Sequence, residues 1–555
     1  MSDTIPVIPA PRRELSETQE ILLPRRSASR VDKPEATPRD LVVWVVAGVA
    51  TVLAVVATVH FALNRETLGF HDAYSHLEIS RRVLASRTTG IAQLGTIWLP
   101  LPHILQALFA WNSTLYVTGL AGSIVSGLSY VAATVLIYRI VVELCDGRRS
   151  AGVIAAAVFG TNVNILFLQT TAMDELPFYA FTLAAVYELI KWAGSRRATH
   201  LLNAAVANSL AMLCRYEAWV LSAVLAVCVV IIARQQGHTW RDVRGLAGVW
   251  VAFGAAVSAT LWFVYNWMVT GNPLNFYNGP DSSKAQMARR QGDIEVGSWP
   301  KSLQAYAQTM ISTMGLLVLV LAVVGLVVFL YRERLAARAL PVLAMLTLLP
   351  FYVYSLESGQ MPIGIPPVNG DLLNVRYGLI GLIPAAILIG YLADQARVGV
   401  TARVSRRLSD GATVAVSAAV VAALLGMSAY VHSNHQVVLL RESLNEEGSQ
   451  QFQIEAENYL QHQTTGPIMV NLVGNERVAY RVLDRVIYEG TKSGSQNVWK
   501  KALADPNVVG AQVLVMRNSP TRGVDQVFYF LESWPGLSAY HVGFTNPEYT
   551  IYVRN

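Results

Sequence analysis

Eleven apolar stretches, separated by polar connections, constrain this chain more than any other feature. A helix needs about 20 predominantly apolar residues to cross the hydrocarbon core of a bilayer. The stretches cover residues 41–63, 115–143, 151–168, 176–193, 201–214, 218–233, 245–269, 311–331, 338–355, 378–393 and 411–431. They predict a polytopic α-helical membrane protein with about eleven transmembrane helices.

The composition supports this fold class. Of the 555 residues, 53% are hydrophobic and only 14% are charged, whereas a soluble domain has about 25% charged residues. This deficit excludes a soluble globular enzyme, a disordered chain and a nucleic-acid binder with a basic face. We therefore expect the lipid bilayer, and no nucleic acid, as a partner.

The basic residues gather in alternate connections and so predict the orientation. These connections contain Arg148-Arg149, Lys191–Arg197, Arg234–Arg244, Arg332–Arg338 and Arg397–Arg407. Residues 1–40 are also basic, rich in proline and without an apolar run, which predicts a disordered cytoplasmic tail. Because basic loops stay in the cytoplasm, the N-terminus is expected inside and the C-terminus outside a plasma (inner) membrane.

The other connections, predicted to lie outside, hold most residues capable of chemistry. The first of them contains His71, Asp72, Tyr74, His76 and His103, within two predicted interfacial helices at about 72–112. For the His71-Asp72 pair, the pattern leaves open a solvated helix cap or a catalytic role.

Two acids, Asp174 and Glu175, stand at the start of the fourth apolar stretch, just before Pro177. Acids at this position stabilise a helix through its dipole. They are equally suited to be a carboxylate pair that holds an acceptor hydroxyl or a metal ion. The sequence leaves both interpretations open.

Two arginines lie at the expected outer ends of apolar stretches. Arg215-Tyr216-Glu217 joins two stretches with almost no loop, and Arg376-Tyr377 precedes another. Ionisable groups at this depth are costly, so they pair or bind something. One interpretation is a mutual ion pair or side-chain snorkelling towards water. The other is a site for a lipid phosphate.

Residues 432–555 are polar enough to form an extracytoplasmic domain. Helical patterns at 451–462, 498–504 and 524–531 alternate with strand patterns at 467–472, 511–516, 539–544 and 549–553. This alternation predicts a small α/β domain. No catalytic set is recognisable in it, which leaves a lid or packing role and acceptor binding as interpretations.

The order of these motifs resembles the GT-C glycosyltransferases. It is most similar to bacterial membrane transferases related to the lipid A aminoarabinose transferases and protein O-mannosyltransferases, and the mycobacterial arabinofuranosyl- and mannosyltransferases share the plan. The resemblance covers residues 41–395 and is carried by His71–Tyr74, Trp98–His103, Asp174–Tyr179, Arg215–Glu217, Gly271–Pro273 and Arg376-Tyr377.

The resemblance implies a polyprenyl-phosphate sugar donor and an extracytoplasmic glycan, glycolipid or protein acceptor. It implies direct displacement with inversion, with Asp72 as general base. The donor phosphate would be held by Arg215, Arg376 and Tyr377. The acceptor or sugar would be oriented by His71, Tyr74, His76, His103, Asp174, Glu175 and Glu217.

The resemblance supports metal binding less strongly than it supports the other roles. Many relatives have two adjacent acids in the first loop, whereas here His71 precedes Asp72. The spacing of the histidines and acids matches no closed zinc site. No cofactor is therefore assigned, although a divalent cation is compatible with the resemblance.

The main rival function is a transporter or flippase of a lipid-linked sugar. It would need binding groups at mid-membrane and broken helices, whereas the apolar stretches hold few charges near their centres. A second rival, a membrane scaffold with a receptor domain, leaves the ionisable residues at several stretch ends unexplained. The position of the pocket distinguishes the two main cases: the outer surface for an enzyme, the membrane centre for a transporter.

Overall fold

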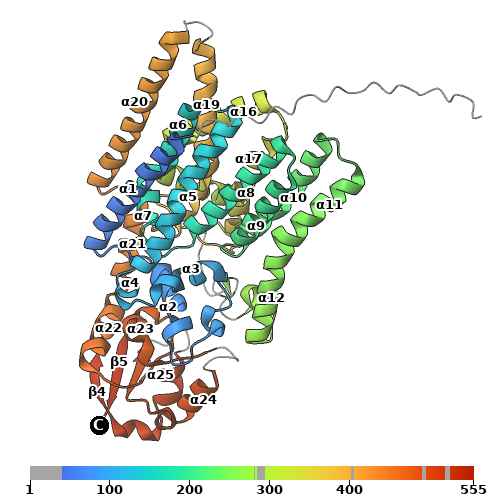
Figure 1. Ribbon diagram of the computed structural model, residues 1–555. Coiled ribbons are helices and arrows are strands. Elements are labelled where there is room, and N and C mark those ends of the chain that lie inside the picture. The colour runs from blue at the N-terminus through green and yellow to red at the C-terminus, as the bar shows by residue number, and fades with distance from the viewer. Residues whose placement is uncertain are drawn as a thin grey trace, which may run out of the picture. The chain divides into compact units, whose positions relative to one another are not determined.

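The computed structural model describes residues 40–279, 282–283, 285, 294–401, 406–490, 496–518 and 525–555. The predicted cytoplasmic tail, residues 1–40, lies outside this range except for its last residue. Val42–Asn555 form one unit, which begins with a long helical part and ends with a small sheet (Figure 1).

In the described residues, eight helices are long and apolar enough to cross a membrane. They are Val42–Leu63, Leu120–Leu144, Glu217–Gln235, Trp240–Thr270, Leu316–Glu333, Leu340–Glu357, Val375–Val398 and Val414–Gly448. Individual helices within these stretches are α1 (Val42–Leu63), α5 (Leu120–Leu144), α10 (Glu217–Gln235), α11 (Trp240–Val251), α12 (Val257–Thr270), α16 (Leu316–Glu333), α17 (Leu340–Met345), α18 (Leu348–Glu357), α19 (Leu382–Thr401) and α20 (Arg406–Ser433). The membrane-protein fold is therefore confirmed, with fewer full-length spans than predicted.

The three remaining predicted spans are helical, but one is broken and one is short. The 151–168 stretch breaks into α6 (Arg149–Gly160) and α7 (Val163–Leu168), because Asn162 caps α7 by accepting hydrogen bonds from two backbone N–H groups. Helix α9 (Ala198–Met212) has only 15 residues. Helix α8 (Glu175–Ser195) has 21 residues and packs against both α5 and α9.

The segment before α8 is held tightly against α5. A Cβ added to Gly122 would lie 2.2 Å from the Cβ of Ala172, so only glycine allows this approach. The hydroxyls of Ser123 and Ser126 donate to the carbonyls of Thr170 and Thr171 at 2.6 and 2.8 Å. These contacts fix the position at which Asp174 enters α8.

Two short helices follow α1 in the region 72–112, and their place in a membrane interface stays a prediction. They are α2 (His71–Ala85) and α3 (Pro100–Ala110), and they pack against each other. Pro100 at the first position suits a helix start, because its missing N–H would have no partner there. Helix α4 (Ser113–Val117) then leads into α5.

The C-terminal domain contains a five-stranded mixed sheet in the order β2-β1-β3-β5-β4. Strands β1 and β2, and β1 and β3, are parallel, whereas β5 is antiparallel to β3 and β4. The strands are β1 (Ile468–Met469), β2 (Val486–Ile487), β3 (Val513–Arg517), β4 (Tyr540–Thr545) and β5 (Tyr549–Arg554). The predicted α/β domain is confirmed, and β2 is a strand that the sequence pattern missed.

Alternation along β3 builds one core on each face of this sheet. Val513 and Val515 join a cluster with Leu460 of α22 (Gln451–Gln463). Leu514 and Met516 join another cluster with residues of α24 (Gln496–Ala504) and α25 (Gln526–Leu531). The period of two in a strand explains why neighbours face opposite layers.

The C-terminal domain is attached to the first connection of the membrane part. The hydroxyl of Tyr116 donates to the carbonyl of Tyr480 at 2.9 Å, and the hydroxyl of Tyr480 donates to the carbonyl of Tyr116 at 2.6 Å. The hydroxyl of Tyr488 donates to Gln93. Helix α23 (Glu476–Ala479) packs against α2, so the domain borders the region where His71 and Asp72 begin their helix (Figure 1).

Candidate active site

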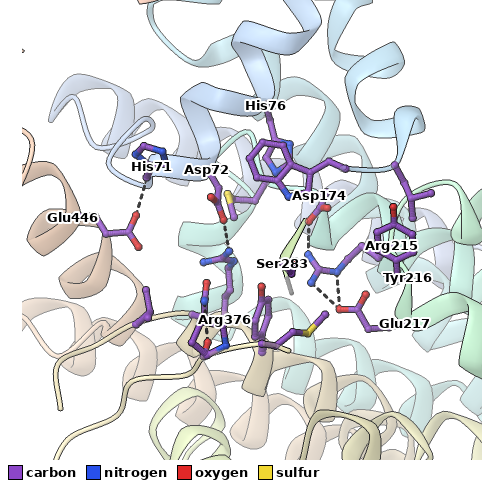
Figure 2. A pocket seen from close by; sticks show the side chains of 18 of the residues that line it. His71, Asp72, His76, Asp174, Arg215, Tyr216, Glu217, Ser283, Arg376 and Glu446 are labelled. Atoms are coloured by element: carbon purple, nitrogen blue, oxygen red, sulfur yellow. Dashed lines mark hydrogen bonds and ion pairs between the residues drawn. The ribbon is translucent and has the colours of Figure 1, made fainter. Parts of the chain in front are cut away.

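A cavity of about 690 Å³ lies where the start of α2, the entries of α8 and α10, residues 360–377 and the α21–α22 region meet. Here α21 is Val438–Gly448. Its charged and polar lining includes His71, Asp72, His76, Asp174, Arg215, Glu217, Arg376, Tyr377, Glu446, Ser449, Gln450 and Gln453. Figure 2 shows the labelled side chains converging from these elements.

Asp72 is the second residue of α2, and its carboxylate does not cap the helix. It accepts a hydrogen bond from Nη2 of Arg376 at 2.5 Å, and its side chain is 30% exposed. Burial raises the pKa of Asp72, but the charges of Arg376, His76, His71 and Arg215 together outweigh burial and lower the pKa below its ordinary value. Asp72 is therefore an ionised carboxylate at neutral pH and has access to the cavity.

Arg215 is surrounded by three carboxylates. Its Nη1 atom lies 2.5 Å from Asp174 and 2.9 Å from Glu175, and Nη2 lies 2.7 Å from Glu217. Its Nε atom also donates to Glu217, which accepts a further hydrogen bond from the hydroxyl of Tyr352. The mutual ion pair that the sequence left open is therefore present.

Arg376 belongs to the same network. Its Nε atom donates to Oε1 of Glu175 at 3.0 Å, the oxygen that also accepts from Arg215. Its Nη1 atom lies 3.7 Å from Glu442. The ring of Tyr377 lies near both guanidiniums, with centroid distances of 5.0 and 5.3 Å. Arg376 is therefore buried in an ionic network and does not snorkel.

Burial controls the charge of Asp174. Its carboxylate contacts Arg215, yet burial dominates and raises its pKa above the ordinary value, with the charge of Arg215 opposing this effect. The acid does not cap α8 with its side chain. The contact with Arg215 thus replaces the helix-dipole interpretation as the main interaction of this side chain.

The predicted histidines take different places. The backbone N–H of His71 donates to Glu446 at 2.7 Å, and its ring lies 2.6 Å from the hydroxyl of Tyr74. The Nδ1 atom of His76 lies 2.8 Å from Nε2 of His103. Burial lowers the pKa of His76 to about 4, so this ring is neutral near pH 7.

Three predicted acceptor or sugar contacts lie behind the cavity lining. Tyr74 donates to Gln450, His103 contacts His76, and Glu175 bridges the two arginines. All three are buried and none lines the cavity. They hold lining residues in place and do not themselves face the cavity.

The sequence interpretation did not select the lining residues of α21 and α22. Glu446, Ser449, Gln450 and Gln453 come from the predicted C-terminal domain, for which no site had been recognised. The polar residues Glu442, Glu446, Gln450 and Gln453 recur at near-helical spacing. That stripe was the signal available in the sequence.

The carboxylates of the cavity do not fit a metal centre. In the described part of the chain, no group of three or more His, Cys, Asp or Glu side chains is arranged to hold a metal ion. Asp72, Asp174 and Glu217 are directed at guanidiniums. These carboxylates therefore pair with arginines and are not grouped around a cation site.

No family model matches the chain, and no curated protein matches it in sequence. Among solved structures, it is similar to ArnT from Cupriavidus metallidurans bound to undecaprenyl phosphate, with a TM-score of 0.53 and 12% identity. The match covers 90% of this chain and 97% of that one. AglB, an oligosaccharyltransferase from Archaeoglobus fulgidus, matches with a TM-score of 0.48, 9% identity and coverage of 86% and 69%. The ArnT likeness confirms the predicted resemblance for the fold: this chain has the fold of the GT-C membrane glycosyltransferases.

Proposed function

We propose that this protein is a glycosyltransferase that moves a sugar from a polyprenyl-phosphate donor to an extracytoplasmic acceptor. The observation that carries this proposal is the cavity in which the Asp72 carboxylate and the Arg376 guanidinium meet beside Arg215. The structurally similar ArnT was solved with undecaprenyl phosphate, which supports a lipid-phosphate ligand. The sugar is a hexose or a pentose.

Asp72 has the position of a general base. Its carboxylate is ionised and reaches the cavity, so it can accept the proton of an acceptor hydroxyl. General-base catalysis by a positioned side chain contributes about 10²–10⁴-fold to a rate. The hydroxyl oxygen would attack the anomeric carbon from the side opposite the phosphate, which inverts the configuration.

The arginines would stabilise the departing phosphate. Arg215 and Arg376 both line the cavity, and their bonds to buried carboxylates fix the orientation of their guanidiniums. Preorganised charges in a dry site favour the developing negative charge of a leaving group. Tyr377, next to both guanidiniums, would complete this phosphate side.

The α21–α22 region would form the acceptor side. Gln453 is only 7% exposed, lines the cavity, and its Oε1 atom has no hydrogen-bond partner among the described residues. Gln450 uses its Oε1 atom to accept from Tyr74. Uncharged amides of this kind suit the hydroxyl groups of a glycan, because they donate and accept hydrogen bonds.

The cavity would face the extracytoplasmic side, as the basic connections suggest. It is lined by helix ends and connections such as Asp72, Asp174 and Gln360. A site at helix ends favours an enzyme over the rival transporter, whose binding groups would lie near the centres of broken helices. Labelling of single cysteines at 450–490 from outside intact cells tests this orientation, and protection there contradicts it.

The experiment that tests the function is transfer by the purified full-length protein in nanodiscs. It would be given a panel of radiolabelled polyprenyl-phosphate hexoses and pentoses with cell-envelope extract as acceptor. We expect transfer from at least one donor by the wild type and loss of at least about 10²-fold with Asp72→Asn. Asp146→Asn, on an exposed side chain outside the cavity lining, is the matched control. Near-normal transfer by Asp72→Asn contradicts the assignment of the base.

A further inference from the structure

The two arginines of the cavity have more carboxylate partners than their charges require. Arg215 contacts Asp174, Glu175 and Glu217, whereas Arg376 contacts Asp72, Glu175 and Glu442. A lipid phosphate is itself an anion, and uncompensated charge in a buried site is very costly. A lipid phosphate that pairs with Arg376 must therefore compete with the carboxyl groups that already contact it.

Exposure identifies the carboxylate that can be exchanged. The side chain of Asp72 is 30% exposed, whereas those of Asp174, Glu175, Glu217 and Glu442 are 9% exposed or less. Arg376 is itself only 4% exposed. A phosphate that enters the cavity therefore meets Arg376 at the position that Asp72 occupies, as the ion pair in Figure 2 illustrates.

We infer that the polyprenyl phosphate left after transfer binds by taking the place of Asp72 as the partner of Arg376, while Asp72 holds a proton. This inference rests on the proposed function and adds to it. Arg376 is then shared between the base and the leaving group. Arg376 pairs with Asp72 before the reaction and with the phosphate after it.

The transfer step balances in atoms and charge. A lone pair of the acceptor oxygen forms the new bond to the anomeric carbon. The bond between that carbon and the phosphate oxygen breaks, and its electron pair remains on the phosphate. The donor, a phosphodiester monoanion, becomes a phosphate monoester dianion, and the acceptor proton moves to Asp72. The carboxylate loses the negative charge that the phosphate gains.

The exchange also answers how a strongly paired carboxylate can serve as a base. In the free protein, burial raises the pKa of Asp72, but Arg376 and the weaker charges of His76, His71 and Arg215 together lower it more, so the pKa lies below its ordinary value. When Arg376 pairs with the phosphate, its charge lowers the pKa of Asp72 less. The effect of burial then raises that pKa, and the carboxylate becomes more basic. The other charged or titratable groups around Asp72 are His71, Tyr74, His76, Glu175, Arg215, Tyr377 and Glu446.

The test measures proton uptake when undecaprenyl phosphate binds to the full-length protein in nanodiscs. Calorimetry would be done with a chelator present, in two buffers of different ionisation enthalpy. A pH of about 7.5 lies above the second phosphate pKa of about 6, so the free ligand is mostly a dianion. The wild type should take up close to one proton, and Asp146→Asn should behave like it.

The Asp72→Asn variant should bind undecaprenyl phosphate about tenfold more tightly, because the competing carboxylate is gone. It should take up no proton, although the surrounding histidines, acids and arginines are unchanged. Absence of proton uptake by the wild type overturns the inference without reference to any variant. Equal uptake by Asp72→Asn, or binding that appears only after Mg²⁺ is added, also overturns it.

These outcomes differ from failure of the proposed function. Binding without proton uptake, together with sugar transfer, removes only the exchange. Absence of both transfer and binding removes the proposed function as well. The two experiments therefore separate the role of Arg376 from the class of reaction.

Discussion

The two sides of the cavity satisfy their polar groups in opposite ways. On the membrane side, the guanidiniums of Arg215 and Arg376 are paired with carboxyl groups, most of them buried. On the opposite, uncharged side stand the glutamines of the α22 region, where Gln453 keeps an amide oxygen without a partner among the described residues.

The difference follows from the cost of burial. An unpaired buried charge costs far more than an unpaired buried amide. Charged groups must therefore be paired before a substrate arrives, and a substrate can join them only by exchange. A buried amide can stay without a hydrogen-bond partner until a substrate binds, at a cost of about 1–3 kcal/mol. The first side suits transfer of charge, and the second suits recognition of hydroxyl groups.

Removal of the central guanidinium is expected to have the largest effect. Arg215→Met leaves Asp174, Glu175 and Glu217 without their main counter-ion, and breaking such a buried network costs about 3–5 kcal/mol. Thermal unfolding in detergent, followed by tryptophan fluorescence, measures the loss. Lys191→Met is the matched control, because the side chains of Lys191 and its partner Glu143 are 32% and 36% exposed. The control should cost about 1 kcal/mol or less. Equal losses in the two variants contradict the comparison.

The pH dependence tests the ion pair between Asp72 and Arg376. Burial raises the pKa of Asp72, but Arg376 and the other nearby positive charges lower it below its ordinary value of 3.8. The paired carboxylate stabilises the protein above the unfolded-state pKa, and this contribution is lost as the pH falls through the folded-state pKa. The active, ionised form is lost over the same range, so kcat/KM for transfer should show no Asp72 limb between about pH 5 and 7.

Arg376→Gln is expected to raise the pKa of Asp72. Without the guanidinium, burial is the largest remaining influence and raises the pKa of this carboxyl. The acid limb of kcat/KM should therefore move to higher pH. An unchanged limb in this variant contradicts the assignment of the base to Asp72.

A smaller effect is expected on the uncharged side. Gln453→Leu removes the unpartnered amide while keeping a similar volume. Loss of one neutral hydrogen bond to an acceptor hydroxyl should raise the acceptor KM by about three- to tenfold and leave the donor KM unchanged. Initial rates at graded amounts of envelope extract measure both. Gln451→Leu, an exposed position on the same helix, should change neither.

The sequence predicted the charged side better than the uncharged side, for a physical reason. Asp72, Asp174, Arg215 and Arg376 stand at the ends of apolar stretches, where an ionisable residue contrasts sharply with its surroundings. Glutamines 450 and 453 lie in a polar segment, where they look like any solvated helix face. Their role in the cavity depends on how the C-terminal domain packs against α2, which is a long-range contact.

Prediction of the fold from the sequence has the same limit. Hydropathy located the helices, because an apolar run of sufficient length has few alternatives in a bilayer. It could not detect the break at Asn162 or the two-residue strand β2. These features depend on a capping hydrogen bond and on pairing with a neighbouring strand. Which carboxylate pairs with which arginine also depends on packing, so the ionic network could not be derived from spacing.

The smallest expected effect concerns the attachment between the two sides. Tyr116 and Tyr480 exchange hydroxyl-to-carbonyl hydrogen bonds, and their ring centroids lie 4.4 Å apart. Tyr480→Phe keeps the ring contact and removes one hydrogen bond, at a cost of about 1 kcal/mol. The melting temperature should fall slightly, and Tyr529→Phe, on an exposed side chain of the same domain, should leave it unchanged. Because α22 belongs to that domain whereas Arg215 and Arg376 do not, Tyr480→Phe should raise the acceptor KM modestly and leave undecaprenyl phosphate binding unaltered. Weaker binding of undecaprenyl phosphate would mean that the C-terminal domain also orders the ionic network, and the two sides of the cavity would then not be independent.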